Sequence, residues 1–97
     1  MNDRFASLRH ATASALLEGS GTTSVDLRRA IARGDPPPEL VTLVQKIRAR
    51  AYTVTDADLD ALRGRYTDDQ LFEIILAAAF GAASDQLSAA YQALEDA

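Results

Sequence analysis

Few side chains in this sequence are suited to catalysis. The chain has no cysteine, which excludes a thiolate nucleophile, a disulfide and a cysteine metal site. Its one histidine, His10, has a side chain that titrates near neutral pH, but no acidic residue follows it at three or four positions. We interpret His10 as a surface residue. The sequence therefore predicts no peroxide reduction with a thiol donor.

Three polar residues are candidates for a catalytic or ligand-binding site: Glu39, Arg50 and Tyr52. They supply a carboxylate, a guanidinium and a phenol, which could converge on a pocket between helices. Glu39 also follows three prolines at a predicted helix start, where the helix dipole favours a carboxylate by about 0.3 to 1 kcal/mol. A structural role is therefore the competing interpretation of this residue.

Acidic residues gather at two places without forming the pattern of a cation site. The D-x-D-x-D-G loop of a calcium site is missing. The aspartates within residues 56–60 and 68–69 instead follow threonines at predicted helix starts, where capping explains them. We predict no bound metal and no cofactor.

The basic residues are too few for a protein that grips phosphate backbones. Ten basic against fourteen acidic residues give a net charge of −4. The helix expected after Gly64 starts with two aspartates and continues with apolar residues, where a DNA-reading helix needs Arg, Asn or Gln. We predict no nucleic-acid partner. The basic residues then form either a solvated helix face or a patch for an anionic ligand: Lys46, Arg48, Arg50, Arg63 and Arg65.

Helical periodicity and helix start signals predict an all-α protein, a small helical bundle with a buried C-terminal helix. The expected segments are an N-terminal amphipathic helix at residues 1–18, a connector with a short helix at 19–37 and a helical core at 38–97. Ser24 caps the short helix and Gly34 ends it. Pro38 begins the next helix, which runs to about residue 51. Capping patterns predict two more helices, at 56–63, ended by Gly64, and from 68 onward.

The stretch at residues 67–80, T-D-D-Q-L-F-E-I-I-L-A-A-A-F, is apolar on nearly every face of a helix. It is shorter than the roughly 20 apolar residues that span a bilayer, so we predict no membrane segment and expect other helices or a second copy to cover it. The apolar spacing continues through Ala83, Leu87, Tyr91 and Leu94. A helix from 68 to 94 is about 40 Å long, so it should bend near Gly81 or pack on another subunit. We predict a homo-oligomer. The first residues lack the apolar run of a signal peptide, which favours a cytoplasmic location.

Several segments resemble one superfamily. They are E-L-V-T-L-V at 39–44, R-A-Y-T at 50–53 and A-L-R-G-R-Y-T-D-D-Q-L at 61–71, followed by the apolar helix. This order is similar to the core of the alkylhydroperoxidase D and carboxymuconolactone decarboxylase superfamily, over residues 38–94. The resemblance implies an all-helical fold that assembles into dimers, trimers or hexamers.

The chain departs from the peroxidase branch of that superfamily at its reactive positions. The branch carries a glutamate, a C-x-x-C motif and a histidine, which fall here on Glu39, Arg50, Thr53 and Ala57. Only Glu39 keeps a side chain capable of the family role, so the resemblance implies a member without the redox cysteines. The decarboxylase branch needs no cysteine and stays open, although the matched histidine is missing there too.

Two functions follow from these observations. The first is a non-redox, oligomeric accessory or interaction subunit, with a related protein of the same superfamily as a possible partner. The second is a small cofactor-free enzyme of the decarboxylase or lyase type, or a small-ligand binder, with Glu39, Arg50 and Tyr52 in a pocket between helices. A closed apolar interface favours the first, and a cavity of a few hundred Å³ with converging polar groups favours the second.

Overall fold

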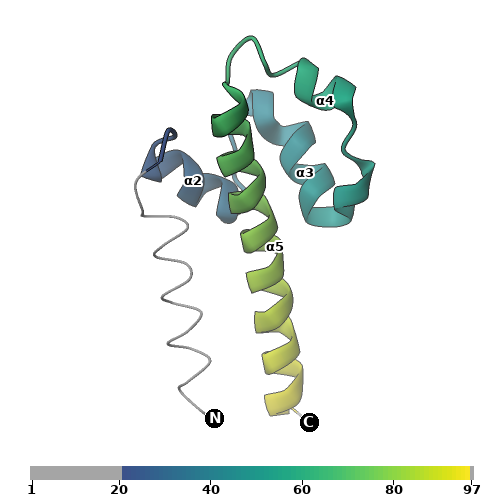
Figure 1. Cartoon of the computed structure of the whole chain (residues 1–97). Coiled ribbons are helices and arrows are strands. Elements are labelled where there is room, and N and C mark those ends of the chain that lie inside the picture. Colours follow the sequence, from purple (N-terminus) through teal and green to yellow (C-terminus); the bar gives the residue numbers. More distant parts are fainter. Residues whose placement is uncertain (1–20, 97) are drawn as a thin grey trace.

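The computed structural model describes residues 21–96, and these form an all-α arrangement around one long helix (Figure 1). The described part contains no strand. The predicted helix at residues 1–18, with His10, lies outside the described residues. The α-helices are α2 (Val25–Ala32), α3 (Val41–Arg50), α4 (Asp56–Asp60) and α5 (Asp68–Asp96), and two 3₁₀ turns flank α3, at Pro38–Leu40 and Ala51–Thr53.

Helix α2 begins and ends as its sequence predicts. The Ser24 hydroxyl accepts a hydrogen bond from the Leu27 amide at 3.1 Å, which makes Ser24 the N-cap. At the other end Gly34 has φ 81°, a left-handed conformation that glycine adopts at little cost. The Gly34 amide donates to the Ile31 carbonyl and the Asp35 amide to the Ala30 carbonyl, the two bonds of a Schellman motif.

The capping patterns at Thr55 and Thr67 are also confirmed. Thr55 and Asp58 form a reciprocal capping box at the start of α4. At the start of α5, the Gln70 side chain accepts from the Thr67 amide at 2.9 Å and the Thr67 hydroxyl accepts from the Gln70 amide at 3.1 Å. These side chains use backbone donors that a helix start leaves without intrahelical partners.

The end of α4 was predicted incorrectly. The helix ends at Asp60 rather than near residue 63, and only Gly34 has a positive φ among the described residues, so Gly64 is not a left-handed helix end. The chain continues in tight turns in which the amides of Leu62 and Arg63 bond carbonyls three residues earlier. These turns carry the Leu62 side chain, which is 7% exposed, into the core, and this burial outweighs continuation of the helix.

The core lies between one face of α5 and the helices α2 and α3, which pack against its first half (Figure 1). Ile74 and Ala77 of α5, Ile31 of α2 and Leu40 before α3 are all completely buried. Leu43, Val44 and Ile47 of α3 complete this core together with Leu71 and Ala78. The pattern of buried positions along α3 and α5 matches the helical spacing on which the fold prediction was based.

Gly81 allows α2 and α5 to approach each other closely. A Cβ atom on Gly81 would stand 2.2 Å from the Ala32 carbonyl oxygen and 2.8 Å from the Ala32 Cα. Both are backbone atoms, so no side-chain movement relieves the overlap. Helix α5 runs without interruption through this residue. Gly81 is therefore a packing requirement between two helices and not a break in α5.

The described fold covers only one face of α5, although its sequence is apolar nearly all round. Phe72 is 60% exposed and Leu94 is 66% exposed. After Asp85 every residue of the helix is exposed except Tyr91, which is partly buried. In Figure 1 this C-terminal half extends past α2 and α3. The expectation that the chain's own helices enclose this helix is thus met on one face alone.

Candidate functional site

Glu39, the strongest candidate from the sequence, lies in the 3₁₀ turn before α3 and binds residues that precede α5. Its Oε1 accepts a hydrogen bond from the Tyr66 hydroxyl at 2.9 Å, and the Arg65 Nη1 lies 3.6 Å from the same oxygen. These contacts connect the start of α3 to the turn that leads into α5. The carboxylate therefore joins two segments that are 27 residues apart.

The surroundings of Glu39 favour its ionised form. A backbone hydrogen bond at Glu39, then the Tyr66 hydroxyl and the positive charge of Arg65, lower the pKa of the carboxyl from its usual value, against a smaller opposing effect of burial. Burial and the hydrogen bond to Glu39 raise the pKa of Tyr66 in turn. A general base works best with a pKa near the working pH. Glu39 is therefore suited to hold a hydrogen bond and poorly suited to take up a proton.

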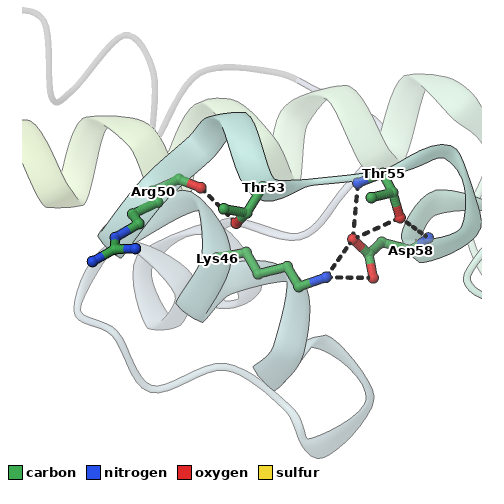
Figure 2. Close-up of polar contacts among 5 residues, drawn as sticks. All are labelled: Lys46, Arg50, Thr53, Thr55 and Asp58. Atoms are coloured by element: carbon green, nitrogen blue, oxygen red, sulfur yellow. Dashed lines mark hydrogen bonds and ion pairs between the residues drawn. The ribbon is translucent and has the colours of Figure 1, made fainter.

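Arg50 and Tyr52 are placed at the other end of α3 from Glu39. The 11 positions between Glu39 and Arg50 correspond to about 16 Å along a helix. Arg50 is exposed and Tyr52 is 83% exposed. The Arg50 carbonyl accepts from the Thr53 hydroxyl at 2.7 Å, while its guanidinium points away from the nearby polar contacts in Figure 2. No described contact joins Glu39 to Arg50 or Tyr52.

Lys46 of α3 and Asp58 of α4 form the polar contact that Figure 2 shows in detail. The Lys46 Nζ lies 3.0 Å and 2.8 Å from the two carboxylate oxygens of Asp58. Asp58 also accepts from the Thr55 amide at 2.9 Å. The bond from Lys46, followed by the bonds from Thr55, lowers the pKa of Asp58. This pair fixes the short α4 against α3, so Lys46 belongs to the fold and not to a free basic patch.

Arg48 connects three helices. From α3 its Nη1 donates to the Ala32 carbonyl at the end of α2, at 3.0 Å, and its Nη2 pairs with Asp85 of α5. The guanidinium thereby donates to a carbonyl that has no intrahelical partner because it lies at the end of α2. Because Ala32 and Gly81 are in close contact, Arg48 and Asp85 hold the helices together at a point where α2 and α5 approach each other closely.

Two open clefts adjoin Arg48 and Asp85. One has a volume of about 520 Å³ and lies between Arg48, Gln45 and the turn at Gly34, Asp35 and Pro36. The other, of about 350 Å³, lies between the end of α2 and residues 80–85 of α5. Neither is lined by Glu39, Arg50 or Tyr52.

Glu73 is the most strongly perturbed acid of the described residues. On α5, its carboxylate accepts from the amide and hydroxyl of Thr22, at 2.8 and 2.5 Å, and from those of Thr23, at 3.1 and 2.7 Å. Burial opposes ionisation, but these four hydrogen bonds outweigh it and lower the pKa of Glu73 to about 2. A Cβ on Gly21 would stand 2.5 Å from Glu73 Oε1 and 3.4 Å from Arg28 Nη1. The loop before α2 is therefore fastened to α5 at a point where a side chain at position 21 would displace the Glu73 carboxylate.

Sequence reasoning missed both Glu73 and the contact between Arg48 and Asp85, although signals for them exist. Glu73 is the one charged residue within an otherwise apolar run of α5, and a charge in such a place needs a partner. The loop G-T-T-S at residues 21–24 offers backbone and hydroxyl donors in sequence. Gly81 in the middle of a helix costs about 1 kcal/mol relative to alanine, which itself indicates a packing reason.

The surface of α5 opposite the core carries a continuous row of apolar side chains. We name these seven exposed residues the α5 stripe: Phe72, Leu76, Ala79, Ala83, Leu87, Ala90 and Leu94. At 100° per residue they fall within about 80° of the helix circumference, centred about 180° from the buried positions. The stripe is about 33 Å long at 1.5 Å per residue. Its largest members are exposed by 36% to 66%.

No charged residue lies on the stripe between Phe72 and Leu94. Glu73 and Asp85, the two acids within this span, are held by the Thr22 and Thr23 loop and by Arg48. A long uncharged apolar surface of this kind marks an interaction site when it occurs on a folded protein.

By length and apolar composition alone, helix α5 could cross a membrane. No other helix in residues 21–96 meets both criteria. The core helix of a water-soluble protein meets the same two criteria. Here α2 and α3 pack on the helix, and its two internal acids have partners, Glu73 with the loop before α2 and Asp85 with Arg48 of α3. Crossing a bilayer would separate these acids from their partners. Within the same described range, no group of histidine or acidic residues forms a possible metal site.

Comparison with known proteins gives no relative from which a function could be transferred. A scan against protein-family models found no match, and searches of curated proteins and of solved structures found none either.

Proposed function

We propose that this protein is a non-redox interaction subunit that assembles through the α5 stripe. The observation that carries this proposal is the division of α5 into two apolar faces. The face around Ile74 is completely buried by the chain's own helices, and the face around Ala83 is exposed. A side chain such as Leu or Phe contributes about 1.5 to 3 kcal/mol when it is fully buried. The four large members of the stripe therefore provide a substantial driving force for association.

Other features support an interaction role over a chemical one. A backbone hydrogen bond and the Tyr66 hydroxyl lower the pKa of Glu39, so it is a weak proton acceptor. The chain has no cysteine. As part of the proposal we retain the resemblance to the alkylhydroperoxidase D and carboxymuconolactone decarboxylase superfamily, as a cysteine-free and cytoplasmic member. A related protein of that superfamily is then a possible second partner.

The test is the effect of stripe substitutions on the mass of the protein in solution. A Leu87→Glu, Leu94→Glu double variant places two carboxylates on the stripe. We expect light scattering to give the monomer mass of 10.4 kDa for this variant and a larger mass for the wild type. Ser88→Glu is the matched control, because Ser88 is equally exposed on α5 but lies about 140° from the centre of the stripe. If the double variant keeps the wild-type mass, the stripe is not the interface.

A second candidate, a small-ligand binder or cofactor-free enzyme, has one observation in its favour. The cleft beside Arg48 has a volume of about 520 Å³, which lies within the range of small-molecule sites. Against it, Arg48 is already engaged by Ala32 and Asp85. If this cleft binds an anionic ligand, thermal stability of the wild type should rise with ligand concentration and that of Arg48→Gln should not.

A further inference from the structure

The spacing of the residues along the α5 stripe reads the same in both directions. The intervals between its members are 4, 3, 4, 4, 3 and 4 residues, so the stripe is symmetric about Ala83. An antiparallel pair of identical helices brings together positions whose numbers have a constant sum. With a sum of 166, Phe72 faces Leu94 and Ala83 faces its own copy.

We propose that two copies of the chain pair through their α5 helices, antiparallel, with the twofold axis at Ala83. This proposal rests on the proposed function and names its partner and geometry. It requires that large side chains within the stripe meet small ones, because facing surfaces pack at high density. In this register Leu76 meets Ala90 and Leu87 meets Ala79, so each of these two leucines occupies the space that an alanine leaves. Phe72 and Leu94 meet at the two ends of the stripe.

A parallel pair lacks this complementarity. Each residue would then face its own copy, so that Leu76, Leu87 and Leu94 would meet leucines while the alanines between them would meet alanines. The helices would be held apart at some layers and leave gaps at others.

The repeat length also suits a nearly straight pair of helices. The stripe consists of two 11-residue intervals, from Phe72 to Ala83 and from Ala83 to Leu94, with 3.67 residues per turn. This value is slightly above the 3.6 of an unstrained α-helix, so a slight right-handed supercoil keeps the stripe on the contact side. The bare half of each α5 then lies along the half of its partner that α2 and α3 support.

The carboxylates at the C-terminal end of α5 would be crowded in a parallel pair. Helix α5 ends with Glu95 and Asp96 and contains no basic residue. A parallel pair would bring four of these carboxylates together. In the antiparallel register these carboxylates face positions 70 and 71 of the partner, so the four of them are divided between the two ends of the pair. Asp68 and Asp69 lie in the same first turn of α5, where Arg63 pairs with Asp68, so the gain is separation of the terminal carboxylates and not a new pairing of opposite charges.

Single cysteines test the register without interference, because the natural chain has none. In the full-length protein, Ala83→Cys should form a covalent dimer under mild oxidation, since the two copies meet at the twofold axis. Leu94→Cys alone should not, since its copy is about 33 Å away and a disulfide needs Cα atoms within about 7 Å. A mixture of Phe72→Cys and Leu94→Cys should form the mixed dimer. Ser88→Cys, off the stripe, is the control for random collisions.

Each outcome separates this inference from the function on which it rests. If the wild type assembles but Leu94→Cys pairs with itself, or Ala83→Cys does not, the antiparallel register is wrong and the interaction role stands. If the wild type is monomeric, both the antiparallel register and the interaction role are wrong. The stripe is then covered by residues 1–20 or by lipid. Sedimentation with phosphatidylcholine vesicles identifies coverage by lipid.

Discussion

Replacing Glu73 with glutamine should destabilise the protein more than any other charge-neutralising change on α5. The carboxylate accepts four hydrogen bonds from Thr22 and Thr23, and a hydrogen bond to a charged group contributes about 1.5 to 3 kcal/mol. Glutamine keeps one of the two oxygens and loses the charge. The pKa gives an independent magnitude, because lowering it from 4.5 to about 2 corresponds to about 3 kcal/mol. Glu73 is partly exposed, so solvent screening reduces this value to about 2 kcal/mol.

Thermal unfolding followed by circular dichroism measures this effect. For a domain of this size 1 kcal/mol corresponds to about 4 to 8 °C, so Glu73→Gln should lower Tm by about 8 to 16 °C at pH 7. The difference should also depend on pH. The folded-state pKa of Glu73 is below its unfolded value, so its stabilisation is complete above pH 4.5 and is lost as pH falls through about 2. The wild type and the variant should therefore converge in that range.

Glu95→Gln is the control, because it makes the same substitution at an exposed position near the end of the same helix. It should leave Tm unchanged within about 4 °C, since surface changes stay within about 0.5 kcal/mol. If Glu73→Gln lowers the free energy of unfolding by less than about 0.5 kcal/mol, its effect is no larger than that of an ordinary surface substitution. That result would refute the reasoning. So would a difference of the same size at pH 2 and pH 7.

Three further predictions concern the packing around α5. Gly81→Ala should lower stability in thermal unfolding by about 1 to 3 kcal/mol, because the alanine Cβ meets the Ala32 backbone, although alanine has the better helix propensity. Gly64→Ala is the control and should be neutral or slightly stabilising, because a Cβ there has no atom within 4 Å. Ile74→Ala should cost about 2 to 5 kcal/mol in urea unfolding, because the side chain is completely buried, and a cost below 1 kcal/mol would contradict the assigned core. Arg48→Gln should cost about 1 to 3 kcal/mol through loss of its bond to the Ala32 carbonyl, and an unchanged midpoint would show that this contact does not hold the helices together.

Local signals in the sequence predicted most of the helix boundaries. Ser24, Thr55 and Thr67 cap helices because a short polar side chain needs only the neighbouring backbone amides to do so. Gly34 ends α2 for an equally local reason. The end of α4 was missed because it depends on the burial of Leu62 in the hydrophobic core, and no local pattern contains that information.

The contacts that join the helices were harder to predict. Glu73 meets residues about 50 positions earlier, and Arg48 meets Asp85 37 positions later, so sequence spacing gives no indication of either pairing. The candidate site residues Glu39, Arg50 and Tyr52 were selected by residue type, whereas their placement depends on which end of α3 each occupies. The α5 stripe was partly predictable, because Leu87 and Leu94 continue the apolar spacing. The sequence alone does not tell which of the two apolar faces the fold uses for its own core.

The most direct test of the central claim is the mass of the wild-type chain by sedimentation equilibrium at micromolar concentrations. If the α5 stripe holds two copies together, the mass should approach twice the chain mass of 10.4 kDa and fall toward the single-chain value on dilution. A mass of 10.4 kDa at every concentration would contradict the claim.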